Sequence, residues 1–515
     1  MGYLGVFCVV FLRKKRNKTG SISVSIVEKR DGKLYYLHRV GYASDEASLR
    51  VLEIKGNQQI NRLKATQPLD FSYAEDTDYL NYLRNNITSV KSEVCVRVLE
   101  QLFADIGFTA IKEDLFRHLV VMRLLYPVSK LKTTEHLYHH YQINYDIDYL
   151  YRYMDKLLDY QELLQQICYN HTLQILQGVP AIVFYDVTTL YFEAESEDDL
   201  RKTGFSKDGK AQHPQIVLGL LVSAEGYPLA YDIFEGNTFE GKTMLPVIAA
   251  FKMRFRLQHL IIVADAGLLS NKNIEQIIDN GDQFILAARI KNESGSIQQQ
   301  ILSLCLKDGQ SAIIDKADGT RLIVSYASSR AKKDAYNRQR GIAKLELALK
   351  SGKLSKKDIN NRGYNKYLKI DGVISVSIDY PKLKEDEKWD GLKGYITNTQ
   401  LDKEHVITQY KNLWQIEKAF RISKTDIRAR PIYHRLAKRI KSHLNICFCS
   451  YKLYKEMERV LKEKNTGLSP NKALEILKSI YTVETILPAS NKKASLLIVN
   501  NEEQKLLLNS FNLYY

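Results

Sequence analysis

The chain has 515 residues, which is too long for one hydrophobic core and typical of about three domains. A hydrophobic content of 45% excludes a wholly disordered chain, and a formal net charge of +16 indicates a polyanionic partner, most often nucleic acid. The six cysteines are too few and too scattered for a disulfide framework, so a reduced, intracellular protein is expected.

Residues 1–177 are predicted to form a mainly helical region that begins with a β-hairpin. The apolar start, Gly2–Leu12, is too short to span a bilayer, and its basic residues follow it, whereas those of a secretory signal precede it. We expect no membrane-spanning segment elsewhere. Alternation at period two predicts the hairpin from Ser21–Val27 and Lys33–Val40. Helical patterns cover Asp45–Lys64, Val90–Ile106 and most of Lys112–Leu176.

The segment from Ala181 to Arg289 contains the strongest signal for a catalytic domain. Strands are predicted at Ala181–Phe192, Ile216–Ser223, Leu229–Phe234, Leu260–Ala264 and Phe284–Ala288, and helices at Thr243–Phe255 and Asn271–Asp279. This order of elements is that of an RNase H-like domain, in which the first and fourth strands lie side by side. Asp186 lies within the first strand and Asp265 follows the fourth. Because a carboxylate in an apolar strand is costly to bury unless it is paired or binds metal, both are candidate metal ligands.

Basic residues concentrate in three places after Asp186. The loop Gly204–Lys210 carries Lys207 and Lys210, which suits either a loop near phosphate or an ordinary solvated loop. Arg330–Lys369 holds thirteen Lys and Arg against three acids, and Lys418–Lys441 holds nine against one. Aromatic and aliphatic residues are interleaved with these charges, which favours a nucleic-acid path over solvated tails. Strand and helix patterns are predicted within residues 292–390 at Ala312–Asp315, Arg321–Ser325, Ile374–Ile378 and Tyr336–Lys353.

A helix predicted at Lys403–Ile422, with Asp402 as its N-cap, carries the third candidate carboxylate. Tyr410, Glu417 and Lys424 are spaced by seven, so they share one stripe of a helix, which Arg421 and Arg428 extend. An ordinary solvated face would show the same pattern. The apolar residues Val406, Leu413, Ile416 and Phe420 are expected to pack elsewhere, and further helices are predicted at Leu444–Leu461 and Asn471–Tyr481.

The segment Tyr410–Lys424 resembles the Y-(2)-R-(3)-E-(6)-K signature of the IS4 superfamily of DDE transposases, and most closely the IS1634 family of bacterial insertion sequences. Leu413 stands where that signature has Arg, which in relatives helps to hold a terminal phosphate of the transposon end. Either Lys411 or Arg421 supplies this charge or the copy is impaired. The family motifs around the two Asp fit Tyr185–Thr189 and Val263–Gly267, and the usual family start fits Arg13–Ser21, so that Met1–Val10 would be an extension.

The resemblance, which covers about Phe11 to Lys455, implies an α/β, RNase H-like (retroviral integrase-like) core with an inserted α/β subdomain. The implied parts are 1–177, mainly helical and DNA-binding; 178–291, the first part of the core; 292–390, the basic insertion; 391–440, the final strand and the helix that carries Glu; and 441–515, a helical end.

By the same resemblance Asp186, Asp265 and Glu417 would be catalytic and bind two Mg²⁺ or Mn²⁺ ions. The enzyme would cut at transposon ends and join the 3′-OH to target DNA by cut-and-paste. Contacts to double-stranded DNA are expected from Tyr410, Arg421, Lys424, Lys207, Lys210 and Arg428. A homodimer in the bacterial cytoplasm, associated with the nucleoid and not with a membrane, is implied. The alternatives are an RNase H-like nuclease without strand transfer and an inactive DNA-binding copy.

Overall fold

The computed structural model describes residues 9–18, 20–30, 32–64, 80–265, 271–352, 354, 359–360, 363–371, 375–487 and 490–513. The chain divides into two compact units: unit 1 comprises Met1–Val98 and Val460–Tyr515, and unit 2 comprises Leu99–Arg459. The division into five parts stays a prediction. In the described residues no helix is long and apolar enough to cross a membrane, and the five described cysteines are all free.

Unit 1 begins with a three-stranded antiparallel sheet in the order β1-β2-β3, packed on one helix. The elements are β1 (Val9–Arg16), β2 (Ile22–Arg30), β3 (Lys33–Ala43) and α1 (Glu46–Lys64). The predicted hairpin and helix are confirmed. Val9 and Val10, expected to belong to an extension, pair with β2 as part of β1, while residues 1–8 lie outside the described part. Gly56 of α1 allows close approach, because a Cβ there would meet Leu12 Cδ2 at 2.4 Å.

The second sheet of unit 1 joins segments from both ends of the chain, in the order β16-β15-β4. Its elements are β4 (Ile87–Lys91), β15 (Tyr481–Ile486) and β16 (Lys493–Ile498), with the helices α16 (Pro470–Lys478) and α17 (Glu502–Ser510). Two expectations were wrong here. The helix α3 (Val94–Ile106) begins later than predicted, after β4, and the C-terminal region is not purely helical. The partners of this sheet are so distant in sequence that local patterning gave no sign of their pairing.

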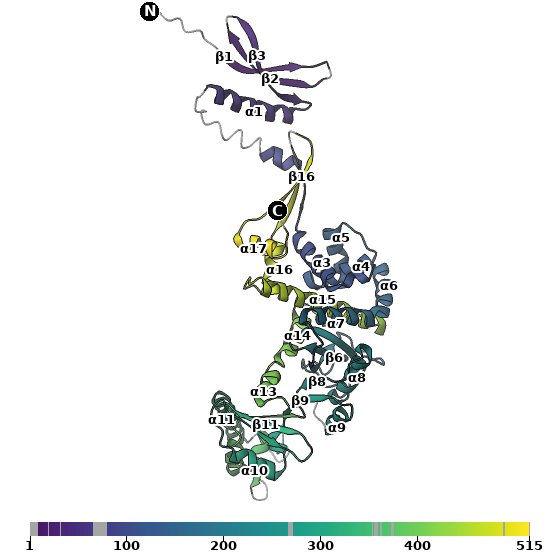
Figure 1. The fold of residues 1–515 in the computed structure, drawn as a ribbon, viewed down its shortest axis with the longest axis vertical. Helices are drawn as coiled ribbons and strands as arrows, with labels where there is room; N and C mark the ends of the chain where they lie inside the picture. The colour runs from purple at the N-terminus through teal and green to yellow at the C-terminus, as the bar shows by residue number, and fades with distance from the viewer. Residues whose placement is uncertain are drawn as a thin grey trace, which may run out of the picture. The chain divides into compact units, whose positions relative to one another are not determined.

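Unit 2 is built on one mixed sheet of eight strands in the order β10-β11-β14-β9-β8-β5-β6-β7. Figure 1 labels β6, β8, β9 and β11 of this sheet. The strands are β5 (Ile182–Tyr191), β6 (Gln215–Ser223), β7 (Pro228–Glu235), β8 (Ile261–Ala264), β9 (Gln283–Ala288), β10 (Ser311–Asp315), β11 (Arg321–Tyr326) and β14 (Leu392–Thr397). The five predicted core strands are confirmed. The first and fourth, β5 and β8, lie side by side and parallel, with Phe184 opposite Val263.

One face of this sheet is covered by the helices that form its main core. These are α7 (Gln161–Leu176), α8 (Met244–Phe255) and α9 (Asn271–Asp279). Val183, Tyr185 and Val187 of β5 belong to that core. Because side chains alternate along a strand, Asp186 points to the opposite face. The remaining helices that precede the core are α4 (Asp114–Leu125), α5 (Lys130–Tyr141) and α6 (Ile147–Leu157), and the long α15 (Ala437–Glu463) follows it.

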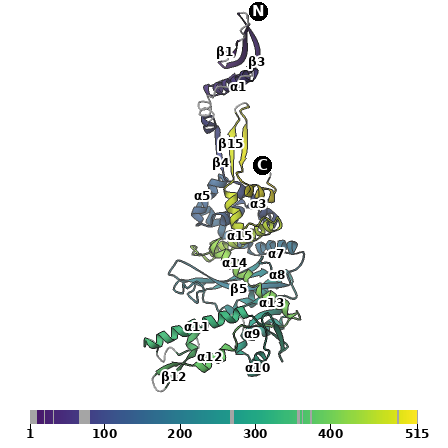
Figure 2. The same cartoon turned by 90° about the vertical axis from the view of Figure 1, so that its left-hand side faces the viewer.

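The predicted insertion adds strands to the core sheet. β10 pairs with β11 and β11 with β14, which itself pairs with β9. The rest of the insertion consists of α10 (Gly295–Ser303), α11 (Ser328–Lys350), β12 (Leu368–Asp371), β13 (Ser375–Ile378) and α12 (Tyr380–Glu387). In Figure 2, α11 lies close to α12 and β12, and a small core of Ile342, Leu345, Tyr367, Leu368 and Ile378 joins them.

The helix predicted at Lys403–Ile422 is two helices, α13 (Lys403–Lys411) and α14 (Trp414–Thr425), which corrects the expectation of one continuous stripe. Asp402 is the N-cap as predicted, since its carboxylate accepts from His405 N at 2.7 Å. The chain turns between the helices where Leu413, only 8% exposed, enters the interior. Asn412, which is a weak helix former, is the C-cap of α13 at this turn, and Leu413 beside it is buried.

Candidate active site

Asp186 lies in the middle of β5, and its side chain is half-buried. Its Oδ1 accepts from Val187 N at 2.7 Å and lies 3.7 Å from Lys207 Nζ. Burial raises the pKa of Asp186 to about 6, and the charges of Glu240 and Asp265 push it in the same direction, against Lys207. A carboxylate in this setting is suited to bind a cation.

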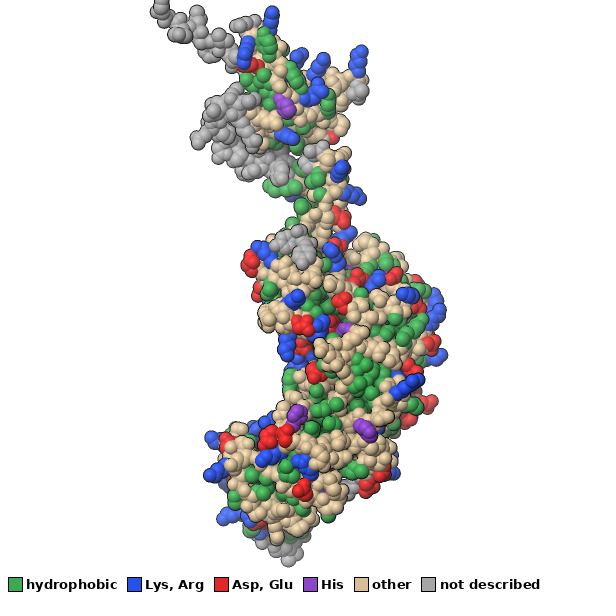
Figure 3. All heavy atoms as spheres, viewed as in Figure 1, with side chains coloured by type: hydrophobic (Ala, Val, Ile, Leu, Met, Phe, Trp, Pro, Cys, Tyr) green, Lys and Arg blue, Asp and Glu red, His purple; other side chains and the backbone are tan. Residues whose placement is uncertain are grey.

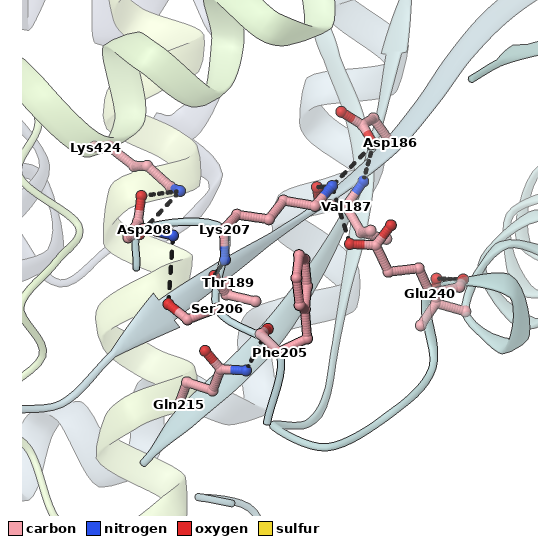
Figure 4. A network of polar contacts seen from close by, with 11 residues as sticks. Asp186, Val187, Thr189, Phe205, Ser206, Lys207, Asp208, Gln215, Glu240 and Lys424 are labelled. Carbon is pink, nitrogen blue, oxygen red and sulfur yellow. Dashed lines mark hydrogen bonds and ion pairs between the residues drawn. The ribbon is translucent and has the colours of Figure 1, made fainter. Parts of the chain in front are cut away.

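Lys207 occupies the space beside Asp186 (Figure 4). Its ammonium donates to Val187 O at 2.7 Å and pairs with Glu240 at 3.1 Å, and its backbone N donates to Thr189 Oγ1 at 3.1 Å. These contacts hold the loop between β5 and β6 against β5, the strand that carries Asp186. The loop therefore does not behave as an ordinary solvated loop. Glu240 was not predicted as part of this site, because a lone acid before α8 gives no sequence signal.

Asp265 follows β8 directly. The parallel register pairs Phe184 with Val263, and continuing it by two residues sets Asp265 beside Asp186. Tyr410 Oη donates to Asp265 Oδ1 at 2.9 Å. Burial and the charge of Asp265 raise the pKa of Tyr410, which keeps the phenol protonated as a donor. Residues 266 and 267, the end of the motif around the second Asp, lie outside the described part.

Glu417 lies on the first turn of α14 and is exposed. Glu417 and Asp265 both lie near Lys393 of β14. Burial lowers the pKa of Lys393, and the negative charges of these two acids raise it. The Lys393 ammonium lies 4.4 Å from the centre of the Tyr410 ring. Because Tyr410 is buried against Asp265, the alternative of an ordinary solvated face does not describe that end of the motif.

The donor chemistry of the three acids fits a divalent metal. Carboxylate oxygens are the ligands that Mg²⁺ prefers. The ammonium groups of Lys207 and Lys393 offset part of the negative charge of these acids and would compete with a metal ion for them. In the described part of the chain, no group of three or more His, Cys, Asp or Glu side chains is close enough to hold a metal ion. The structure thus brings Asp186 of β5 beside Asp265, which follows β8. Glu417, on the first turn of α14, is exposed and does not join them in one cluster.

The predicted DNA contacts differ in their surroundings. Lys424 Nζ lies 3.3 Å from both carboxylate oxygens of Asp208, a residue that sequence reasoning did not single out. Lys210 lies 5.7 Å from the centre of the Tyr191 ring. Arg421 and Arg428 are exposed, whereas Leu413, at the Arg position of the motif, is buried.

A hollow of about 870 Å³ extends from Asp265 and Tyr410 into the insertion. Six Lys or Arg side chains line it together with four Asp, and some of them pair, such as Arg338 with Asp390 and Lys291 with Asp386. Arg289 and Lys393 line the side near Asp265. Trp389 lines this hollow, and Trp414, at the start of α14, is 49% exposed.

Comparison with known proteins gives one family. The family model described as "Transposase DDE domain" matches residues 177–453. No curated protein matches the chain. Among solved structures, the piggyBac transposase in a synaptic complex with hairpin DNA is similar at a TM-score of 0.35 and 8% identity. That likeness covers 58% of this chain and 51% of the other, so the chain spans about half the length of the piggyBac protein. It is too distant to bear on function.

Proposed function

The chain belongs to the transposase DDE domain family, and from this premise we propose that it is a DNA transposase of an insertion sequence. It cuts at transposon ends and joins the freed 3′-OH to target DNA by cut-and-paste. The observation that carries the proposal is the alignment of Asp186 and Asp265 on neighbouring parallel strands, with Tyr410 of the Glu-bearing motif bonded to Asp265. The spacing of Tyr410, Glu417 and Lys424 supports the IS4 superfamily and the IS1634 family.

The core is proposed to be RNase H-like. Five strands of the sheet follow the order β7-β6-β5-β8-β9, with β6 antiparallel to both neighbours and β5, β8 and β9 parallel. The order of the elements predicted that the first and fourth of these strands, β5 and β8, would be neighbours, and they are. The three remaining strands continue the sheet beyond β9, and the Glu-bearing helix α14 packs against β5 and β6.

Asp186, Asp265 and Glu417 are the proposed ligands of two Mg²⁺ or Mn²⁺ ions. Bound there, the ions would supply Lewis-acid stabilisation of an in-line phosphoryl displacement. Tyr410 fixes the orientation of the Asp265 carboxylate through its hydrogen bond. Lys207 balances the charge of Asp186 and holds the β5–β6 loop against the strand.

DNA is the proposed partner of the basic surfaces around this site. Lys207, Lys210, Lys424, Arg421 and Arg428 remain the proposed contacts to its backbone, together with Tyr410. Because Leu413 is buried, it is not placed to reach a phosphate. We assign the role of the missing motif Arg to the exposed Lys411 or Arg421. The hollow beside Asp265, whose lining carries six cations and four Asp, would accept a further length of the same DNA by phosphate contacts from its Lys and Arg side chains.

The outer face of the β1-β2-β3 sheet is proposed as a further DNA-binding surface. Arg13 on β1 and Arg39 on β3 flank Ser25 of β2 on the face away from α1, and both are exposed. Arg39 lies over the rings of Tyr36 and Tyr42, at 5.9 and 5.2 Å. Figure 3 shows several Lys and Arg side chains, and few acidic ones, on this part of unit 1. Sheets with such faces bind DNA grooves in other proteins.

Transposition pairs two element ends, so we propose that the protein acts as a homodimer. Its proposed place is the bacterial cytoplasm, on nucleoid DNA. The family resemblance alone supports these two statements.

Strand transfer tests the proposal. Full-length protein is mixed with a labelled duplex that carries the terminal repeat, a supercoiled target and Mg²⁺ or Mn²⁺. Joined product is expected from the wild type and from Glu404→Ala, an exposed acid on α13, and is expected to be lost in Asp186→Ala and Glu417→Ala. Cleavage without joining would instead indicate an RNase H-like nuclease. DNA binding without cleavage or joining would indicate an inactive DNA-binding copy. The presence of Leu413 where the motif has Arg favours that alternative.

A further inference from the structure

A separate hollow of about 470 Å³ in unit 2 has five Lys or Arg side chains among the residues that line it. It lies where the loop before α5 meets the segment between α14 and α15. These cations are Arg123, Lys130, Lys132, Arg428 and Arg430, and His434 and His443 also line the hollow. Among the described residues that line it, none is Asp or Glu.

Two of these cations are buried around one histidine. Arg123 and Lys130 are 8% and 6% exposed. Arg123 Nη2 lies 3.1 Å and Lys130 Nζ 3.5 Å from His443 Nδ1. Arg123 Nη2 also lies 3.2 Å from His443 Nε2, and Nε2 lies 3.2 Å from Ala429 O. Burial and the positive charges of Arg123 and Lys130 lower the pKa of His443 well below its usual value. His443 is therefore neutral and does not offset either charge.

The electrostatics of this cluster lack a negative partner. Burial, followed by the charge of Arg123, lowers the pKa of Lys130 to about 7. Burial also lowers the pKa of His434, which lines the same hollow, to about 3, and Lys130 and Arg123 push it further down. Arg123 Nε is buried without a hydrogen-bond partner among the described residues. Buried cations are costly unless an anion pairs with them, so the cluster is suited to receive one.

The surroundings fit a phosphate in particular. Ser129, the N-cap of α5, lines the hollow, so the positive end of that helix faces the same space. Arg430, at the edge of the hollow, also lies 3.4 Å from Asp208, which pairs with Lys424 of the Glu-bearing motif. The hollow is thus connected through Arg430 to residues proposed to contact DNA. A planar guanidinium beside an ammonium is the usual donor set for phosphate oxygens.

We propose that this hollow is a phosphate-binding site that holds a phosphate of the bound DNA strand, an assignment that rests on the proposed function. Free inorganic phosphate offers the same chemistry, and the two sources are separated by experiment. The site is distinct from the three carboxylates and from the motif that contains Tyr410 and Lys424.

The first test measures binding of inorganic phosphate to the full chain, by calorimetry and by thermal unfolding at constant ionic strength with chloride as the reference. Lys130→Met is the test variant, because replacing a buried unpaired charge by an apolar chain of similar length is neutral or stabilising. Lys156→Met, an exposed lysine on α6, is the control. Phosphate should raise the melting temperature of the wild type and the control, and bind Lys130→Met at least tenfold more weakly. An equal response of all three proteins would overturn the proposal.

The second test measures binding of a short duplex to the same proteins at several salt concentrations. Lys130→Met should bind the duplex about tenfold more weakly than the wild type. The slope of its log affinity against log salt concentration should fall by about one phosphate contact, and inorganic phosphate should compete with the duplex for the wild type. Unchanged duplex binding without competition would overturn the DNA assignment and leave a site for free phosphate. A protein that passes both tests but joins no strands would refute transposition and leave the phosphate site standing.

Discussion

Asp208→Asn should lower stability and raise DNA affinity at the same time. The Asp208 carboxylate lies 3.3 Å from Lys424 Nζ and 3.4 Å from Arg430 Nε. The side chains of Asp208 and Lys424 are 16% and 11% exposed, so the pair is neither fully buried nor at the surface. Breaking a buried pair costs about 3–5 kcal/mol and an exposed pair at most about 1, so we expect a loss of about 2–3 kcal/mol in unfolding free energy.

The gain in affinity follows from competition. Asp208 occupies the two cations that are proposed to contact phosphate, and DNA must displace it or share them. Removing its charge should tighten duplex binding by about 1 kcal/mol, or roughly fivefold in Kd. Urea unfolding and fluorescence anisotropy with a labelled duplex measure the two effects. Asp199→Asn, an exposed acid of the same loop, is the control. A loss of stability together with weaker or unchanged DNA binding would refute this reasoning.

Three further outcomes are expected. Arg39→Gln on the outer face of β3 should weaken duplex binding severalfold, and Arg50→Gln on α1 should not, as anisotropy can show. Gly236→Ala should destabilise the protein by about 3 kcal/mol or more, because a Cβ there would lie 2.1 and 2.2 Å from two backbone carbonyl oxygens. Gly178→Ala is the control, since its Cβ would meet nothing within 4 Å, and urea unfolding compares the two variants. In phosphate-free buffer, the unfolding free energy of the wild type should rise between pH 7 and about 10 relative to that of Lys130→Met. In this range Lys130 is protonated in the unfolded chain but has lost its proton in the folded one, so raising the pH favours the folded state. A difference in unfolding free energy that does not change with pH would contradict the lowered pKa of Lys130.

Elements whose partners are near in sequence were largely predictable. The five core strands, α8 and α9 fall within a residue or so of their expected bounds, because their patterning and turn residues agree with the final fold. The strand β4 was missed because its partner, β15, lies at the other end of the chain. The pattern predicted the strands β10 and β11, but it could not show that they continue the core sheet, since that pairing with β14 is long-range.

The candidate site was predictable where the residue type is unusual for its place. Asp186 stood out as an acid in an apolar strand, and the spacing of Glu417 from Tyr410 pointed to the third carboxylate. Glu240 and Asp208 carry no such pattern, because both act through a lysine brought to them by the fold of the β5–β6 loop and α14. The spacing of seven also did not reveal the turn at Asn412 and Leu413, which places Tyr410 and Glu417 on separate helices.

The pairing of β4 with β15 constrains how the protein is made on the ribosome. Thr88 bonds to Glu484 across 396 residues, so β4 emerges long before its partner strand exists. At about 5–20 residues per second the delay is roughly 20–80 s. During this interval the sheet β1-β2-β3 and α1, whose contacts are local, can already form, while β4 exposes an unpaired edge that invites association with other nascent chains. Any product that stops before Tyr481 keeps the three carboxylates proposed to be catalytic but never completes unit 1.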